Sequence, residues 1–496
     1  MSNRDTLGCI VSIVAAVGLL AVSGSALSEP PCENRSNNTQ AKLQECVTIE
    51  GVREHQAALQ AIADANGGTR AAGTAGADES AAYVAERLEA AGYDVIIQEF
   101  SITRYEEIGP TILEQVSPNP TVYLDQVDYD LMQYSDSGDV TANVIPVDLD
   151  LGLGNASTSG CEPEDFAGFP AGAIALIQRG ACSFQLKAEN AEAAGAVGVI
   201  IFNQGNTEGR QSLLFGTLTD DYTGGLPVVG ATYALGEEFA MTPGITARLA
   251  ADTIRETTTT ANVLAESVYG DPSNVVMAGA NLDSSFSGPG INDNGSGAAA
   301  LLEVAELMAN VETYNKVRFA WWGSKSSTPV GSLYYVSNLT SEEIDDIALY
   351  LNFDIIGSPN YVRFVYDGDG SDTGIPGPAG SEAIEALFAD FYGARGLASE
   401  RIVGRTDDFS FLLFGIPYGG IYTGTFEIKT EEQAAIYGGT AGEQLDPCAQ
   451  LACDTFDNVS LEVLELNAKA VAYAVLQYAM NTEAVNGREG KGNFKP

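Results

Sequence analysis

The chain is poor in histidine and in basic residues. It has 1 histidine among 496 residues, and 24 Lys+Arg stand against 67 Asp+Glu, a formal net charge of −43. Zinc sites with several imidazoles and triads with a histidine base both need more histidines than this sequence has. Phosphate backbones bind basic surfaces, so we expect no nucleic-acid partner.

Long apolar runs are also missing. The apolar run at residues 10–20 is too short to span a membrane, and small residues that suit cleavage follow it. We therefore expect residues 1–28 to be a signal peptide, although a buried helix is an alternative. The mature protein is then secreted, extracellular or periplasmic, and has no membrane contact.

The cysteines form no C-x-x-C pair. Cys9 lies in the expected signal peptide, which leaves six of the 7 cysteines in the mature chain. An even set in an exported chain predicts disulfides, and many pairings are open. Free thiols or a metal cluster are less favoured. We favour the local pairs, which are Cys32–Cys46, Cys161–Cys182 and Cys448–Cys453.

The length of 496 residues and the hydrophobic fraction of 45% suit two or three globular domains. Strand and helix patterns alternate in the first and last parts of the chain, whereas the middle has short apolar runs broken by Gly, Asp and Pro. We predict an α/β domain made of residues 29–133 and 256–482. A small α/β module at 134–255 interrupts it, and a disordered tail follows at 483–496.

The one histidine, His55, lies on a segment with helical spacing of apolar residues. No acidic residue or cysteine lies three or four positions from it. We therefore interpret His55 as a packed or partly exposed helix residue rather than a metal ligand.

Polar residues follow the apolar strands of the last α/β stretch. Asn281 and Asp283 follow one strand, Asp293 lies in the glycine-rich loop before a helix, and Asp354 follows another strand. Ligands bind outside the carboxyl ends of strands in open α/β sheets, which favours a shared site. As alternatives, Asp293 caps the helix and Asp354 closes a turn at Gly357.

These stretches resemble the co-catalytic dizinc exopeptidases, the secreted aminopeptidases related to bacterial leucine aminopeptidase, aminopeptidase Y and glutamate carboxypeptidase. The resemblance implies a mixed central sheet flanked by helices, and residues 172–184 and 191–203 resemble an inserted protease-associated domain. The motifs that carry the resemblance are residues 288–294, 321–323, 331–332, 352–354, 415–417 and 454–455.

The resemblance also assigns roles to positions. Asp293 and Asp354 match metal-binding carboxylates, and Asp283 matches the Asp that orients the first zinc-binding His. Lys325 stands at the position of the general-base Glu. The remaining ligand positions, His, Glu and His in the family, are here Asn281, Ser326 and Gln450. Three of five metal ligands and the base are therefore replaced.

These replacements change the expected chemistry. Amide and hydroxyl groups are poor substitutes for the ligands that zinc prefers. We therefore expect no cofactor, apart from weak Ca²⁺ binding at Asn281, Asp293 and Asp354. A protonated Lys325 accepts no proton, so the base is lost. We also expect its ammonium to offset the repulsion between Asp293 and Asp354.

A different catalyst is the less favoured interpretation. Ser324, Ser326 and Ser327 flank Lys325, and a Ser–Lys dyad is chemically feasible. We favour a polar loop that lines the pocket. The acidic run at residues 405–408 is interpreted as surface or pocket lining.

The sequence thus predicts a secreted aminopeptidase-like protein that is catalytically impaired or inactive and binds peptides or protein partners. The rival is an active metal-dependent aminopeptidase that removes N-terminal residues with an atypical site. A third interpretation places the working part in the inserted module.

Overall fold

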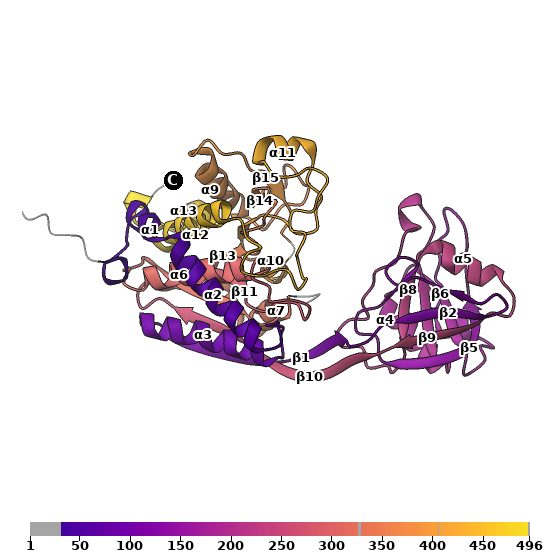
Figure 1. The fold of residues 1–496 in the computed structure, drawn as a ribbon. Coiled ribbons are helices and arrows are strands. Elements are labelled where there is room, and N and C mark those ends of the chain that lie inside the picture. Colours follow the sequence, from indigo (N-terminus) through magenta and orange to yellow (C-terminus); the bar gives the residue numbers. More distant parts are fainter. Residues whose placement is uncertain (1–30, 326–328, 405, 495–496) are drawn as a thin grey trace, which may run out of the picture.

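The computed structural model describes residues 31–325, 329–404 and 406–494. The expected signal peptide and Ser326 lie outside these ranges. The described chain forms two bodies, each built on its own sheet, and a long two-stranded ribbon joins them (Figure 1). We call them the larger body and the smaller body.

The larger body contains a mixed sheet, as the sequence and its resemblance predict. Its four central strands run parallel, and antiparallel pairs flank them. The strands, in sheet order, are β1 (Asp94–Glu107), β10 (Thr253–Glu266), β12 (Asn315–Trp322), β11 (Asp271–Asn281), β13 (Ile347–Phe353), β16 (Tyr418–Tyr422), β14 (Phe364–Tyr366) and β15 (Glu400–Ile402).

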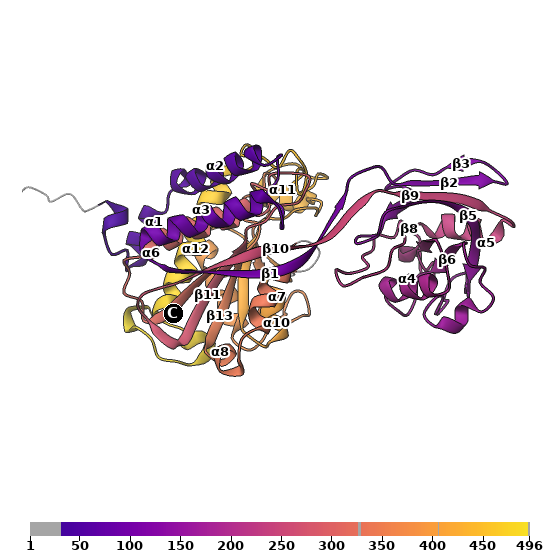
Figure 2. The same ribbon diagram turned by 90° about the horizontal axis from the view of Figure 1, so that it is seen from below.

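Helices cover both faces of this sheet (Figure 2). Successive strand residues point to opposite faces, so Trp321 packs into one apolar cluster and Trp322 into the other. One cluster includes residues of α1 (Gln40–Cys46), α2 (Ile49–Ala65), α3 (Ala75–Ala91), α6 (Gly295–Met308), α9 (Ser381–Gly393) and α12 (Leu461–Met480). The other includes residues of α7 (Val330–Ser337), α8 (Ser341–Asp345) and α10 (Asp408–Leu413). Helix α11 (Glu431–Tyr437) lies near β14 and β15 (Figure 1).

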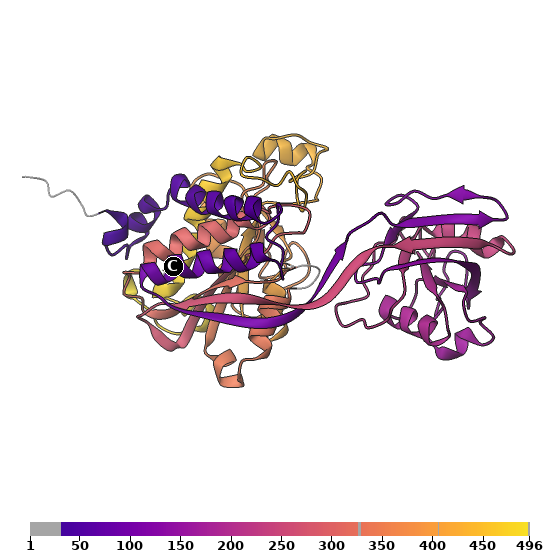
Figure 3. The ribbon, with the colours of Figure 1, turned by 60° about the horizontal axis from the view of Figure 1, so that its bottom comes forward.

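The smaller body is also built on a mixed sheet, seen best in Figure 3. Its strands, in sheet order, are β3 (Thr121–Val122), β2 (Ile112–Ser117), β9 (Thr246–Ala251), β5 (Gly138–Val147), β6 (Ile174–Gln178), β7 (Gly198–Phe202), β8 (Val228–Ala231) and β4 (Tyr129–Leu131). Helices α4 (Phe184–Ala193) and α5 (Tyr233–Met241) pack on it. This sheet begins before residue 134, where we placed the start of the module, because β2 pairs with β9 and β4 with β8.

The six described cysteines form the three local pairs that we favoured. Cys32 is bonded to Cys46, Cys161 to Cys182, and Cys448 to Cys453. Disulfides of this kind are consistent with an extracellular or periplasmic location. Among the described residues, no helix has the length and apolar character needed to cross a bilayer.

The prediction of a disordered tail at 483–496 is wrong for residues 483–494. Helix α13 (Glu483–Asn486) follows Met480, and the side chain of Phe494 is buried in the core that α12 lines. Its carbonyl oxygen also accepts a hydrogen bond from Gln477 Nε2. The buried side chain of Phe494 therefore holds the tail against the larger body, although the tail is otherwise polar in composition.

Close packing of α6 on the sheet positions the loop that precedes this helix. A β-carbon at Gly297 would overlap the carbonyl oxygen of Phe353, the last residue of β13. At the next residue, Trp321 Nε1 donates to the carbonyl oxygen of Ala298 at 3.0 Å. Glycine at 297 thus fixes the distance between α6 and the strand ends.

We expect Gly297→Ala to lower the free energy of unfolding of the larger body by about 1–3 kcal/mol, because α6 must move off β13. Denaturant titration with tryptophan fluorescence measures this, since both tryptophans lie on β12. Gly209→Ala is the control: Gly209 is exposed with nothing near its β-carbon position, so it should stay within about 0.5 kcal/mol. Equal stability of the two variants would contradict the packing argument.

Candidate functional site

The predicted site residues come together at the carboxyl ends of the parallel strands. Asn281 ends β11, and Lys325 and Asp354 follow β12 and β13. Asp293 lies in the loop before α6 and Gln450 in a later loop, and both line a cavity with Lys325. Parallel strands deliver Asn281, Lys325 and Asp354 to one edge, as the strand pattern predicted for Asn281 and Asp354. Lys325 and Gln450 were assigned to the site through the family resemblance.

Lys325 lies between two carboxylates. Its Nζ is 2.7 Å from Asp354 Oδ2 and 3.3 Å from Asp293 Oδ1, and it also donates to Asp354 Oδ1 at 3.0 Å. The side chain of Asp354 is 1% exposed and that of Lys325 is 19% exposed. The backbone N–H of Lys325 donates to Asp283 Oδ2 at 3.1 Å. We call Asp283, Asp293, Lys325 and Asp354 the carboxylate–lysine cluster.

Electrostatics keep this lysine charged. Burial alone would lower the pKa of Lys325, but the nearby carboxylates of Asp293 and Asp354 outweigh burial and raise it. Lys325 is therefore an ammonium at neutral pH. It can donate hydrogen bonds and neutralise charge, but it offers no lone pair to a proton.

Amide side chains complete the edge of the cluster. Asn281 Nδ2 donates to Asp283 Oδ1 at 3.2 Å, and Asn281 Oδ1 accepts from Asn294 Nδ2 at 3.0 Å. Asn294 Nδ2 also donates to the carbonyl oxygen of Phe353. Both ends of the Asn281 amide are thus hydrogen-bonded to protein groups.

Two residues that the sequence interpretation did not assign to the site hold the loop that carries Asp293. Asp454 accepts from the backbone N–H groups of Asn292 and Asp293 at 2.8 and 2.9 Å, and burial raises its pKa to about 7. Arg70, fully buried, donates to the carbonyl oxygens of Pro289 and Gly290. The motif at 454–455 was a signal for Asp454, whereas no local pattern marks Arg70.

Asp407 and Asp408 lie closer to the site than a surface run would. Both are fully buried, and Asp407 accepts from Ser332 Oγ at 2.6 Å. Burial raises the pKa of Asp407 well above its usual value and that of Asp408 to about 6. The charges of Asp354 and Lys325 act on Asp407, so the acids belong to the surroundings of the cluster.

Two cavities meet at the cluster and share Asp293, Lys325 and Gln450. One, of about 400 Å³, extends toward the ribbon and the smaller body, where Arg104, Tyr105, Gln133, Tyr134 and Asp220 line it. The other, of about 530 Å³, lies within the larger body, and its apolar lining includes Ile355, Ile375, Ile402 and Phe426. Lys325 is thus accessible from both sides.

The described side chains do not form a donor set that suits zinc. Asn281 and Gln450 offer amide oxygens, and the ammonium of Lys325 lies between the two remaining carboxylates. Zinc prefers imidazole, thiolate and carboxylate ligands, and a neighbouring ammonium opposes a cation. Ser326, the other substituted position, lies outside the described residues, and the roles assigned to all these positions stay predictions.

Comparison with protein families identifies both bodies. Residues 262–475 match peptidase family M28, and residues 140–239 match the PA domain. An aminopeptidase from Pseudomonas aeruginosa is 50% identical over 503 residues, which cover 98% of this chain and 94% of that protein. A probable lipoprotein aminopeptidase, LpqL, from Mycobacterium tuberculosis is 38% identical and covers 90% of this chain and 88% of its own length.

Solved structures agree. An aminopeptidase from Aneurinibacillus sp. strain AM-1 superposes with a TM-score of 0.68 at 26% identity and covers 92% of this chain and 98% of its own. A zinc aminopeptidase from Bacillus subtilis has a TM-score of 0.59 at 25% identity, with 86% and 95% covered.

The prediction that no cofactor is expected is contradicted by these relatives. The chain's family is one of zinc peptidases, and one similar structure is a zinc aminopeptidase. The prediction inferred the loss of zinc from the replacement of individual ligand residues. The ligand types alone do not justify that step, because carboxylates remain at Asp293 and Asp354.

The catalytic impairment that the sequence predicts is a separate matter, and no comparison shows it. What the two sheets, the strand-end site, the family matches and the near full-length relatives establish together is that this chain belongs to peptidase family M28, the zinc exopeptidases that include aminopeptidases, and carries an inserted PA domain.

Proposed function

We propose that this protein binds the N-terminal end of peptides in the two cavities that meet at Lys325, and that its hydrolysis of the peptide bond is impaired. The observation that carries the proposal is the position of the Lys325 ammonium between Asp293 and Asp354. Family membership supports peptides as the ligand class, and the lysine supports the impairment.

The cavities suit a peptide end. The cavity within the larger body has an apolar lining beside the cluster, which favours a hydrophobic side chain such as leucine. The cavity toward the smaller body is lined by polar and aromatic residues and leaves room for further residues of the peptide. Asp283, Asp293 and Asp220 line it as well, and their charge favours a terminal ammonium group.

Impaired hydrolysis follows from proton chemistry. General-base catalysis requires a group that accepts a proton from water near the operating pH. Lys325 stays protonated because two carboxylates stabilise its charge. Loss of a positioned general base typically lowers a rate by about 100-fold to 10,000-fold.

The second candidate function is hydrolysis of N-terminal residues with an atypical site. The comparisons favour it, because relatives that are aminopeptidases align over nearly the whole chain. Family membership supports hydrolysis of N-terminal residues, whereas the residues of the carboxylate–lysine cluster indicate that this hydrolysis is slow.

We expect the untagged wild-type protein to hydrolyse leucine p-nitroanilide at least about 100-fold more slowly than a variant with all four substituted positions changed. The variant is Asn281→His, Lys325→Glu, Ser326→Glu and Gln450→His, and both proteins are assayed with added Zn²⁺ and with a chelator. Lys469→Glu, a partly buried position on α12 that lines neither cavity, controls for charge. Chelator-sensitive wild-type hydrolysis at the rate of the variant would establish the second candidate instead.

Peptide binding is tested separately by calorimetry. A short peptide that begins with leucine should bind at least about tenfold more tightly than its N-acetylated form, since acetylation removes the charge that the acidic lining favours. Equal affinity for both peptides, or binding to neither, would contradict recognition of the peptide end.

Lys325 should also stabilise the fold. Lys325→Met leaves Asp293 and Asp354 buried without their cation, and we expect a loss of about 3 kcal/mol in the free energy of unfolding near pH 8. Lys469→Met, which removes a lysine from a partly exposed pair with Glu465 one helical turn away, should cost less than about 1 kcal/mol.

This loss should depend on pH. The raised pKa keeps wild-type Lys325 charged throughout the range below about pH 8, so the pH dependence comes from the variant. Its unpaired carboxylates take up protons as the pH falls, and the difference between variant and wild type should shrink at about pH 5. Denaturant titrations at both pH values measure it, and an equal or larger difference at low pH would refute the charge argument.

We also propose that the chain is exported and that peptides or protein partners reach it outside the cytoplasm. The disulfides support export, because such bonds persist in oxidising compartments. The expected signal peptide and the identity of partners stay predictions.

A further inference from the structure

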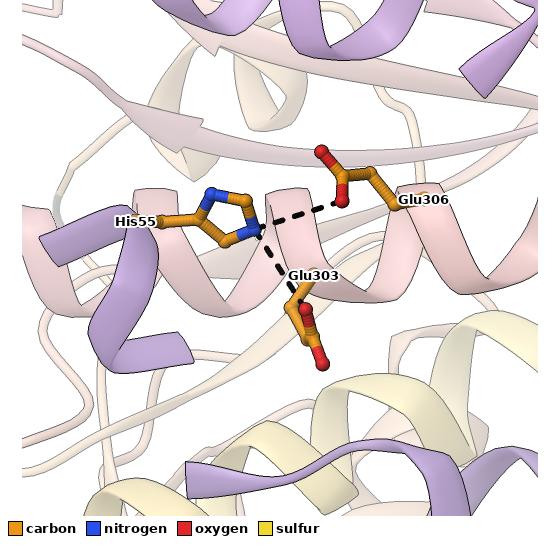
Figure 4. Close-up of side chains that lie close together, drawn as sticks. All are labelled: His55, Glu303 and Glu306. Atoms are coloured by element: carbon orange, nitrogen blue, oxygen red, sulfur yellow. Dashed lines mark ion pairs between the residues drawn. The ribbon is translucent and has the colours of Figure 1, made fainter. Parts of the chain in front are cut away.

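The one histidine of the chain is buried beside two glutamates, far from it in sequence. His55 lies on α2 and is 1% exposed, while Glu303 and Glu306 project from α6 toward it (Figure 4). His55 Nε2 is 3.7 Å from Glu303 Oε2 and 4.0 Å from Glu306 Oε2. The sequence interpretation found no acidic partner because it examined α2 alone.

The imidazole has one nitrogen without a hydrogen-bond partner. Nδ1 is 2.8 Å from the hydroxyl of Tyr83, whereas Nε2 is buried and makes no hydrogen bond. When Nδ1 carries the proton and donates it to Tyr83, the lone pair of Nε2 faces two carboxylate groups. Arg87 pairs with Glu306, but the Nε2 lone pair stays without a donor and faces the Glu303 carboxylate, an arrangement that attracts a cation.

We propose that His55, Glu303 and Glu306 bind a divalent transition metal ion, with Zn²⁺ as the best match. One ligand atom from each residue lies within 4.8 Å of the others. Tetrahedral zinc with bonds of about 2.1 Å separates its ligand atoms by about 3.4 Å. The observed separations from Nε2 therefore need to shorten by only a few tenths of an ångström.

Ligand type favours a transition metal over Ca²⁺ or Mg²⁺. Those ions prefer all-oxygen sites, whereas an imidazole nitrogen with carboxylates suits zinc. Three protein ligands leave a fourth position for water, and the side chain of Glu306 is 19% exposed, which leaves a path to solvent.

The surroundings orient the ligands. The Tyr83 hydroxyl fixes the ring through Nδ1, the type of outer contact that metal-binding histidines make. Arg87 donates to both oxygens of Glu306, from Nε to Oε1 at 2.6 Å and from Nη2 to Oε2 at 2.7 Å, and this bidentate pair holds the carboxylate with Oε2 4.0 Å from His55 Nε2. A β-carbon at Gly51 would overlap the Glu303 carboxylate, so glycine leaves room for it against α2.

This site is distinct from the carboxylate–lysine cluster. Glu303 lies nine residues after Asn294 along α6, which corresponds to about 13 Å of helix. The imidazole belongs to the α2–α6 interface, and neither cavity at Lys325 is lined by any of the three residues.

The test uses the single imidazole as a probe. Untagged protein labelled with ¹⁵N-histidine is titrated with ZnCl₂ at about pH 7.5, and the two ring nitrogens are followed by long-range ¹H–¹⁵N NMR. We expect the Nε2 resonance to shift to a zinc-bound position, saturating at one ion per chain. Zinc that binds at Asp293 and Asp354 does not produce this shift, so the result is independent of the proposed function.

Three variants complete the test. Glu303→Gln and Glu306→Gln keep the side-chain shape, and each should weaken zinc binding at His55 by at least about tenfold. Glu54→Gln is the matched control. It also loses a carboxylate bonded to Arg87, but Glu54 is not one of the proposed ligands, so this variant should bind zinc within about twofold of wild type. An Nε2 resonance that zinc leaves unchanged would overturn the proposal, and so would equal zinc affinity in all three variants. If the unchanged signal is that of an imidazolium, a proton occupies the place of the metal ion.

Discussion

Several carboxylates lie together where the parallel strands of the larger sheet end. The need to neutralise their charge constrains which groups can lie beside them at this edge of the sheet. Asp283, Asp293 and Asp354 are buried there, with Asp407 and Asp454 close by. Carboxylates in such surroundings repel one another and lose hydration. The Lys325 ammonium contacts two of them, backbone N–H groups satisfy Asp454, and Ser332 donates to Asp407.

Framework and chemistry are separable in this family member. The glycine-rich loop, the Trp-Trp-Gly stretch and the strand-end carboxylates maintain the fold through packing and hydrogen bonds. Fold similarity therefore establishes the family, and it does not by itself establish reactivity.

The strand pattern was sufficient to predict the meeting of Asn281, Asp293 and Asp354, because the ends of parallel strands share an edge. The mixed sheet and the position of Lys325 in the site were predicted from the resemblance to a known family. Contacts between distant segments were out of reach. Arg70 supports a loop some 220 residues away through backbone carbonyls, which carry no sequence signal. His55 and Glu303 meet only because α2 packs on α6, and β2 joins the smaller sheet only through its pairing with β9.

The ribbon between the two bodies has a consequence for ligand access. Strand β1 pairs with β10 from Asp94 to Glu107, but β10 pairs with β12 from Val263 to Glu266. Among the described strands, residues 253–262 thus pair with β1 alone. Arg104 and Tyr105, on this ribbon, form a wall of the cavity that reaches Lys325. The curvature of a two-stranded ribbon therefore sets the width of the entrance, and substitutions along it would alter which ligands enter without touching the cluster itself.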